Sequence, residues 1–257
     1  MVLTLVLVGC FAPWIAPHNP YAQDLGATFQ TPSGTHWFGT DEYGRDLFSR
    51  IVYGARLSLL EIGVSVGMSL LIGVPLGLFA GYWGERIDQA VMWAMDMLYA
   101  FPGIVLAILL VAILGPSLFN TLFAIAVFSV PVYARLARNL TLTLKRMEFT
   151  EAARALGANA GRIMFVHILP NALAPILVQA TLTAGDVVLT ASGLSFLGLG
   201  AQPPTAEWGA MMSDGRNFLG VATHLSLFPG VMISFAALGL NILGDGLRDR
   251  LDPKFRA

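Results

Sequence analysis

The stretch EFTEAARALGANAGRIMFVHILP, residues 148–170, is the longest polar and charge-bearing interruption in the second half of an otherwise apolar chain. Small and apolar side chains recur in it at helical spacing, at Phe149, Ala152, Ala153 and Leu156. Gly157 follows them, where the end of a helix needs a residue that tolerates a left-handed backbone. Asn159 is then placed to cap a second helix that runs toward Pro170. The stretch therefore predicts two short helices separated by a bend.

On these residues alone, two interpretations of the stretch are open. The first is a surface loop between two membrane helices, of which any polytopic protein has several. The second is a docking element for a partner protein, because small side chains let a second surface approach closely. The small side chains in question are Ala152, Ala153, Ala155 and Ala158.

The composition places the chain in a membrane. Of its 257 residues, 56% are hydrophobic and 12% are charged, whereas soluble domains carry about 25% charged residues. The net charge of -1 gives no indication of nucleic-acid binding. The single cysteine, Cys10, excludes an internal disulfide.

Apolar runs long enough to span a bilayer, about 20 residues each, predict an all-α polytopic protein with about six transmembrane helices. The expected spans are residues 1–16, 57–84, two within 97–134 that separate at Gly115-Pro116-Ser117, 170–200 and 225–244. Pro102 and Pro131 are expected to kink their helices. Four glycines of the second span include a stripe suited to close helix packing, namely Gly67, Gly73, Gly77 and Gly81.

The chain is expected to divide into three parts. Residues 1–16 form a first transmembrane helix that is short for a span, so either the helix is short or it begins before residue 1. Residues 17–56 form a polar, turn-rich segment outside the membrane, in which Asp46 to Ile51 starts an interfacial amphipathic helix. Residues 57–257 form a five-helix core, with residues 146–170 as the loop between the fourth and fifth spans.

The basic residues divide unequally between the two faces of this topology. Of the 15 lysines and arginines, four lie on the face of residues 17–56, and the other eleven lie on the face of residues 146–170. The eleven are Arg86, Arg135, Arg138, Lys145, Arg146, Arg154, Arg162, Arg248, Arg250, Lys254 and Arg256. The face richer in basic residues is normally cytoplasmic. We therefore expect residues 146–170 and both chain termini in the cytoplasm, and residues 17–56 in the periplasm.

Three acidic residues lie within or beside the apolar runs, and such groups are costly in lipid and often functional. They are Glu61, Asp96 and Asp186. Asp186, nearer the middle of its span, is the best candidate for a group that faces a transport pathway. Asp96 follows Asp88 by eight residues and is expected near the cytoplasmic surface. The alternative for each acid is a position at a membrane face or a pairing inside the bundle.

Motifs for chemistry by the chain itself are absent from the sequence. It contains no Gly-x-x-x-x-Gly-Lys-Ser/Thr loop for nucleotide phosphates, no His-Glu-x-x-His and no Gly-x-Ser-x-Gly. The four histidines, His18, His36, His167 and His224, are scattered without ligand-like spacing. We therefore expect no metal site, no bound cofactor and no enzymatic activity.

Residues 151–170 resemble the "EAA" loop in the membrane subunits of binding-protein-dependent ABC importers. The pattern is Glu-Ala-Ala, three residues, Gly, nine residues and Ile-x-Leu-Pro. The chain matches it with Glu151-Ala152-Ala153, Gly157 and His167-Ile168-Leu169-Pro170, in which His167 replaces the first isoleucine. Further matching pieces are Gly39 to Arg50, Ala100-Phe101-Pro102, Ser195 to Gly200, Glu207-Trp208-Gly209 and Gly244 to Asp249. Over nearly its whole length, the chain resembles the second membrane subunit of dipeptide, oligopeptide, glutathione and nickel importers.

This resemblance implies a bacterial inner-membrane complex of the chain with a sister permease, two cytoplasmic ATPases and an external solute-binding protein. ATP and magnesium would be bound by the ATPase subunits. Coupling to them would fall on the loop residues Glu151, Ala152, Ala153, Leu156, Gly157 and Pro170. The expected mechanism is alternating access driven by the ATPase dimer. The run Ala201 to Thr205 and the tail resemble peptide and glutathione permeases more than nickel permeases.

Two other classes compete with this interpretation. A proton-coupled secondary transporter would use Glu61, Asp96 and Asp186 as relay groups. Such carriers often contain internal repeats, and none is visible here. A membrane-embedded enzyme would need a catalytic constellation that the sequence lacks.

Overall fold

The computed structural model describes residues 1–251, and the regular structure of this part of the chain is helical, apart from one isolated bridge between Thr40 and Asp46. The helices are α1 (Val2–Cys10), α2 (Ala12–Ile15), α3 (Leu47–Trp83), α4 (Glu85–Tyr99), α5 (Gly103–Leu114), α6 (Leu118–Leu144), α7 (Glu148–Ala155), α8 (Ala160–Arg162), α9 (Leu169–Phe196), α10 (Trp208–Gly215) and α11 (His224–Leu251). A π-helical segment, η2 (Ile163–Ile168), joins α8 to α9. Lys254 and Arg256, two of the basic residues in the charge count, lie outside the described residues.

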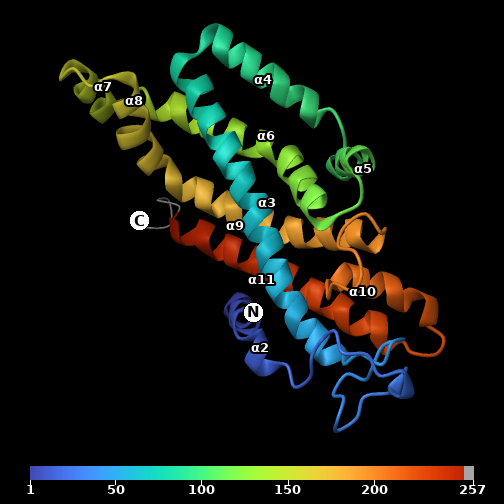
Figure 1. Ribbon diagram of the computed structural model, residues 1–257. Coiled ribbons are helices and arrows are strands. Elements are labelled where there is room, and N and C mark those ends of the chain that lie inside the picture. The colour runs from blue at the N-terminus through green and yellow to red at the C-terminus, as the bar shows by residue number, and fades with distance from the viewer. Residues whose placement is uncertain (252–257) are drawn as a thin grey trace.

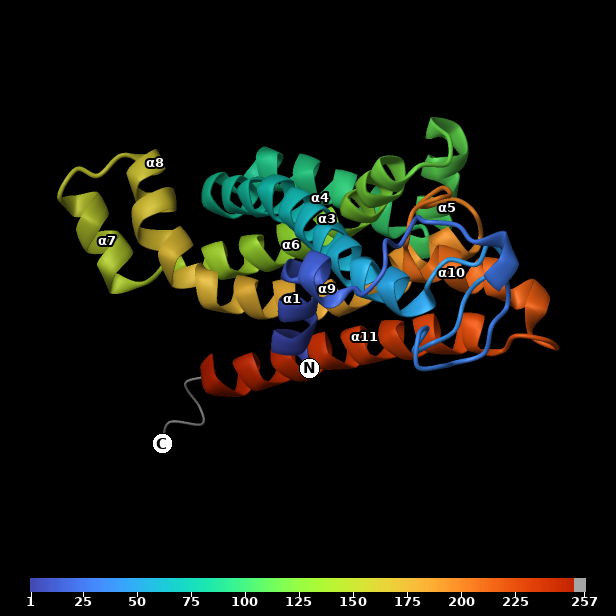
Figure 2. The ribbon, with the colours of Figure 1, turned by 60° about the horizontal axis from the view of Figure 1, so that its bottom comes forward.

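Four long helices, α3, α6, α9 and α11, form the framework of the fold (Figure 1). Within residues 1–251, the segments long and apolar enough to cross a membrane are Leu47–Trp83, Leu118–Leu144, Ala160–Phe196 and His224–Arg250. Figure 2 shows the axes of α3, α6, α9 and α11 broadly aligned, with α9 antiparallel to the other three. The α7–α8 segment lies at one end of these helices, and residues 17–46 and α10 lie at the other. The all-α membrane architecture expected from the sequence is thus confirmed.

The remaining predicted spans are less regular. Helices α4 and α5 pass the test for a span together, but they are bent by 87° at the break around Pro102. Residues 1–15 form the two short helices α1 and α2, of which α1 packs against α3 and α11. Nine helical residues extend about 14 Å, well short of a bilayer core of about 30 Å. The described residues therefore contain four spans, or five if the bent pair is one span, which is roughly consistent with about six.

Helix α3 begins ten residues earlier than the predicted span. Asp46 caps it, because its carboxylate accepts the backbone N–H of Ser49 at 2.8 Å. The helix start expected near Asp46 is therefore confirmed, and its location at the membrane interface stays a prediction. Ser49 and Arg50 are buried by the preceding loop and by the α9–α10 connection. The helix then continues without interruption to Trp83.

A glycine stripe on α3 brings this helix into close contact with α6. A Cβ atom at Gly73, Gly77 or Gly81 would overlap a backbone carbonyl of α6, at Val130, Ala134 and Arg138 respectively. At Gly67, in contrast, a Cβ atom would meet nothing within 4 Å. Three of the four glycines named from the sequence therefore form the close-packing stripe, and Gly67 lies outside it.

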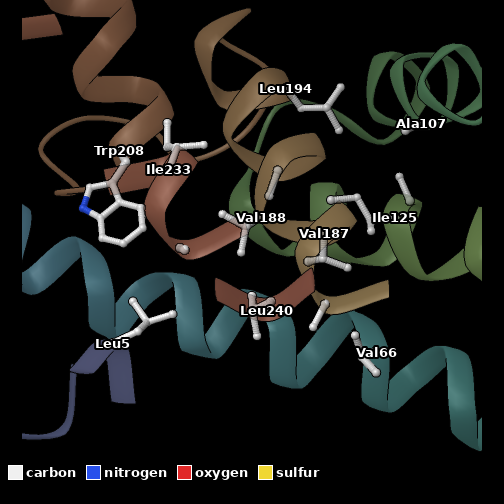
Figure 3. Packing of buried hydrophobic residues seen from close by; sticks show 14 of the residues in the cluster. Leu5, Val66, Ala107, Ile125, Val187, Val188, Leu194, Trp208, Ile233 and Leu240 are labelled. Atoms are coloured by element: carbon white, nitrogen blue, oxygen red, sulfur yellow. The ribbon is translucent and has the colours of Figure 1, made fainter. Parts of the chain in front are cut away.

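The hydrophobic core lies where α3, α6, α9, α10 and α11 meet (Figure 3). Its largest fully buried side chain is that of Trp208, at the start of α10. The indole Nε1 of Trp208 donates a hydrogen bond to the carbonyl oxygen of Ile51 at 3.0 Å. This bond satisfies the buried donor and fixes α10 against the first turns of α3.

Candidate functional site

Residues 148–170 form a helical hairpin beyond the ends of the long helices (Figure 2). Its two arms are α7 and the continuous run from α8 through η2 into α9. Thr150 fixes the base of the first arm, because its buried hydroxyl donates to the carbonyl oxygen of Leu144 at 2.8 Å. Two short helices separated by a bend, as predicted, are therefore confirmed.

Gly157 makes the bend between the two arms. Its φ angle is +84°, a left-handed conformation that glycine adopts without steric cost. Its N–H donates to the carbonyl of Arg154, and the N–H of Ala158 donates to that of Ala153, both at 3.0 Å. These two bonds form a Schellman motif at the end of α7. Asn159 then accepts the N–H of Arg162 at 2.8 Å and caps the second arm, so both predicted caps are confirmed.

The second arm continues directly into a spanning helix. Pro170 has no N–H and its ring would clash with the carbonyl four residues earlier in a regular α-helix. The π-helical segment η2 widens the helix at this point, and the N–H of Leu169 bonds to the carbonyl of Met164, five residues back. The helix from Ala160 to Phe196 therefore runs through Pro170 unbroken. A displacement of the hairpin would accordingly be transmitted along α9.

The hairpin exposes an apolar tip. Leu156, beside the bend, is 89% exposed, and Met147 and Phe149 are exposed large apolar residues at the base of the first arm. Glu151 and Ala152 are exposed on α7, whereas Ala153 is buried against the base. Of the residues named from the "EAA" pattern, Glu151, Ala152, Leu156 and Gly157 therefore lie on the accessible surface. Ala153 packs inward, and Pro170 lies at the root of the second arm.

A second feature is a cavity of about 560 Å³ between the α4–α5 bend, α6 and α9. Asp186 lines it together with Gln179 and Thr183 from the same face of α9, and with Tyr99 and Ser129. The side chain of Asp186 is exposed, although its residue lies within a long apolar helix. The cavity thus combines a carboxylate with neutral hydrogen-bonding groups and aromatic walls, which suits a small polar organic molecule.

The other two acids named from the sequence have different surroundings. Asp96 is exposed and accepts a hydrogen bond from Arg135 at 2.8 Å, outside the cavity. Glu61 is fully buried on α3, and neither carboxylate oxygen has a hydrogen-bond partner among the described residues. The structure therefore does not join the three acids into one relay.

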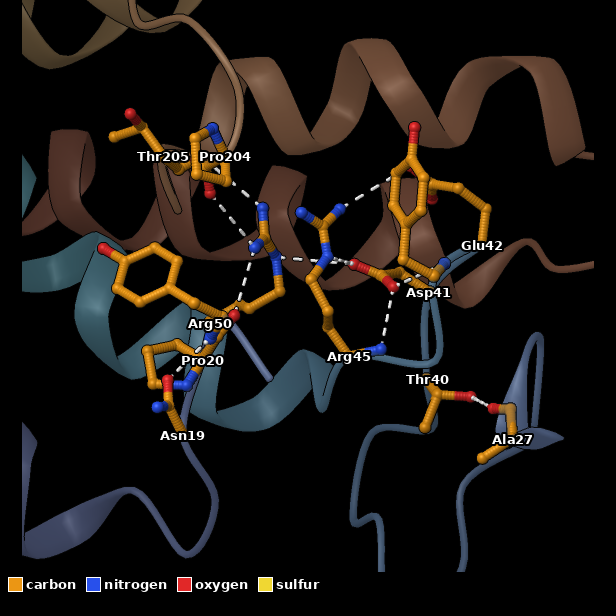
Figure 4. Close-up of polar contacts among 12 residues, drawn as sticks. Asn19, Pro20, Ala27, Thr40, Asp41, Glu42, Arg45, Arg50, Pro204 and Thr205 are labelled. Carbon is orange, nitrogen blue, oxygen red and sulfur yellow. Dashed lines mark hydrogen bonds and ion pairs between the residues drawn. The ribbon is translucent and has the colours of Figure 1, made fainter. Parts of the chain in front are cut away.

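A buried ion cluster that was not predicted from the sequence fixes the loop before α3 (Figure 4). Asp41 accepts a bond from Arg45 Nε at 2.6 Å and lies 3.6 Å from Arg50 Nε. Arg50 also donates to the carbonyls of Pro20, Pro204 and Thr205, so it joins this loop to the α9–α10 connection. Burial raises the pKa of two further carboxyl groups beside the cluster, those of Glu42 and Asp214. The spacing of Asp41 and Arg45 by four residues could have predicted their ion pair. The bonds from Arg50 to the carbonyls of Pro204 and Thr205 have no local signal in the sequence.

Taken together, these features define a polytopic membrane protein with an exposed helical hairpin at one end of its long helices and a polar cavity among them. The family model described as "Binding-protein-dependent transport system inner membrane component" matches residues 73–257. The chain belongs to this family and is a permease component of a membrane transport system.

Curated relatives match the chain over nearly its whole length. It is 50% identical to the dipeptide transport system permease protein DppC of Alkalihalophilus pseudofirmus, over 100% of this chain and 84% of that protein. It is 45% identical to the probable D,D-dipeptide transport system permease protein DdpC of Escherichia coli, over 99% and 85%. It is also 45% identical to the glutathione transport system permease protein GsiD of Pectobacterium atrosepticum, over 100% and 85%.

Solved structures share the fold. A chain from the inward-facing MetNI methionine ABC transporter superposes with a TM-score of 0.61 at 22% identity, over 77% of this chain and 95% of that one. These comparisons confirm the importer-permease resemblance seen in the sequence. The proton-coupled carrier is not favoured, since the family is that of binding-protein-dependent systems.

Proposed function

We propose that this chain is a transmembrane subunit of an ATP-driven importer, and that the hairpin of residues 146–170 couples it to a cytoplasmic ATPase. The observation that carries the proposal is the exposed apolar tip at Leu156 on a hairpin continuous with α9. An exposed leucine at the end of a well-defined hairpin is suited to insertion into a groove of a partner protein. Closure of an ATPase dimer would then move α9 and switch the permease between inward-open and outward-open states.

The complex that we propose contains a sister permease, two ATPase subunits and an external solute-binding protein. ATP and magnesium are bound by the ATPases and not by this chain. The C-terminal end of α11 lies toward the same end of the molecule as the α7–α8 hairpin (Figure 2), which supports a cytoplasmic location for both. Residues 17–46 and α10 would then face the periplasm of a bacterial inner membrane.

The proposed cargo is a di- or oligopeptide or glutathione. The names of relatives that are 45–50% identical, which are dipeptide and glutathione permeases, support this class. The cavity at Asp186 supports it as well, because a carboxylate with neutral polar neighbours can accept hydrogen bonds from the ammonium group that peptides and glutathione share. We therefore assign Asp186 to the transport pathway, and neither Glu61 nor Asp96.

Uptake of a radiolabelled dipeptide, in cells that lack their own dipeptide importer, tests this assignment. The genes encoded beside this one are supplied together with it. Asp186→Asn is expected to lower the uptake rate at least tenfold while membrane insertion is unchanged. The matched control is Asp96→Asn, which removes an exposed acid outside the cavity and should retain most of the uptake. Unchanged kinetics in Asp186→Asn would make this acid structural and remove it from the pathway.

A further inference from the structure

The loop before α3 brings together two histidines that are 18 residues apart in the sequence. The imidazole rings of His18 and His36 lie 4.9 Å apart between centroids, with an interplanar angle of 34°. Asp46 completes the group, because its Oδ1 lies 2.9 Å from Nδ1 of His36. One ligating atom from each of the three residues lies within 4.8 Å of the other two. The expectation that the histidines are scattered therefore does not hold for this pair.

The side chains of Asp46 and His18 are held by hydrogen bonds to the backbone, and Nε2 of the His18 ring donates to the carbonyl oxygen of Thr35 at 3.0 Å. Asp46 caps α3 with its other oxygen, Oδ2, which accepts the N–H of Ser49. The hydroxyl of Ser49 in turn accepts the N–H of His18 at 3.1 Å. The start of a long, buried helix therefore fixes the position of both Asp46 and the backbone of His18. A ligand set that is ordered before an ion arrives has a smaller entropy cost of binding.

The chemistry of the group favours a metal ion of a particular class. Two imidazole nitrogens and one carboxylate oxygen are typical ligands of zinc, nickel and copper, whereas magnesium and calcium prefer oxygen ligands alone. The 2.9 Å between His36 Nδ1 and Asp46 Oδ1 is about 0.4 Å shorter than the separation of about 3.3 Å between two ligands on one tetrahedral ion with bonds of about 2 Å, so the two side chains would move slightly apart when an ion binds. His18 is exposed and His36 is partly exposed, so an ion can reach the group from solvent.

We propose that His18, His36 and Asp46 form a binding site for one divalent transition-metal ion, with a water molecule as a further ligand. The ion replaces the proton that His36 Nδ1 and Asp46 Oδ1 share, and that proton is released to solvent. The bound ion ties residue 18 and residue 36 to the first turn of α3. This site lies at the opposite end of the molecule from the α7–α8 hairpin (Figure 2), and it is independent of the proposed coupling to an ATPase.

Zinc titration of the full chain in detergent tests the proposal, with a purification tag that contains no histidine. Isothermal titration calorimetry and metal analysis after dialysis should give one zinc ion per chain. His18→Ala and His36→Ala should each weaken zinc binding at least tenfold, and magnesium should not compete. His167→Ala is the matched control, since His167 belongs to η2 at the root of the hairpin, and it should bind zinc like the wild type.

His18→Ala is the decisive variant, because His18 is exposed and its loss does not leave a cavity in the core. Asp46→Asn is less informative, since Asp46 also caps α3. Circular dichroism should show the same helix content in His18→Ala and the wild type. Equal zinc affinity in these two proteins, or no saturable zinc binding by the folded wild type, would overturn the proposal and leave a purely structural histidine–aspartate pair.

Discussion

Gly157 is the residue on which the shape of the α7–α8 hairpin depends. A Cβ atom at this position would meet no atom within 4 Å, but the φ angle of +84° is unfavourable for any residue with a side chain. The conformational cost is about 1–2 kcal/mol, and it is largest for β-branched residues. The requirement for glycine therefore comes from the backbone and not from packing.

Gly157→Val should unfold the Schellman motif locally and reduce substrate uptake at least tenfold, with little change in membrane insertion. Gly157→Asn should retain most of the uptake, because asparagine tolerates the left-handed region. Gly161→Ala is the control, since this neighbouring glycine has no positive φ and a Cβ atom there meets nothing closer than 3.6 Å. Equal uptake by Gly157→Val and Gly161→Ala would show that the bend is not needed for coupling.

At Glu61 the stability depends on the ionisation state of one side chain, because both carboxylate oxygens are buried without a hydrogen-bond partner among the described residues. An ionised carboxylate in this position would be very costly. Glu61→Gln keeps the shape and removes the ability to ionise, so its melting temperature should equal or exceed that of the wild type. Glu61→Ala leaves a cavity and should lower the stability by about 2–4 kcal/mol.

Transport activity distinguishes a structural role of Glu61 in the core from a role in a proton relay. We expect Glu61→Gln to transport like the wild type, because the residue lies in the core and not in the Asp186 cavity. Loss of transport in a stable, correctly inserted Glu61→Gln protein would instead restore the proton relay as an explanation.

At the scale of helices, the contact between α3 and α6 depends on three glycines in successive turns. Gly77→Val should force the two helices apart and lower the stability by about 1–3 kcal/mol or more, since the added atoms would overlap the carbonyl of Ala134. Gly67→Val makes the same chemical change on the same helix where no atom lies within 4 Å. Thermal unfolding in detergent measures both variants. Similar losses in the two would mean that helix propensity, rather than the close approach, decides the effect.

Some features of the helices could be predicted from the sequence, and others could not. Apolar runs revealed the long helices, and local rules of capping found Gly157 and Asn159, because these signals act over a few residues. The helix start at Asp46 was predicted, but its continuity with the span from residue 57 was hidden, because residues 47–56 include buried polar groups such as Arg50, whose partners lie at residues 20 and 204–205. The 87° bend was hidden inside one apolar run, where Pro102 was a signal for a kink but not for its size.

In the molecule as a whole, one end of the helix bundle is fixed by buried polar contacts and the other end projects an exposed hairpin. The end with residues 17–46 and α10 is fixed by the buried ion cluster around Asp41 and Arg50 and by the bond from Trp208 to Ile51. The opposite end projects the α7–α8 hairpin with its exposed apolar tip (Figures 1 and 2). The contacts among residues 18, 36 and 46 and those of Arg50 depend on the tertiary fold, so no local pattern could predict them.

The most direct test of the central claim is co-purification in detergent of this chain with the ATPases encoded beside its gene. Wild type is compared with Leu156→Asp, which places a charge at the 89% exposed tip without disturbing the core. The control is Leu25→Asp, at a leucine that is 73% exposed in the loop before α3, at the opposite end of the molecule from the hairpin. We expect the wild type and the control to co-purify with the ATPases, and the amount of ATPase that co-purifies with Leu156→Asp to be at least tenfold lower. Equal association of Leu156→Asp and the wild type, or no association of the wild type, would contradict coupling through the hairpin.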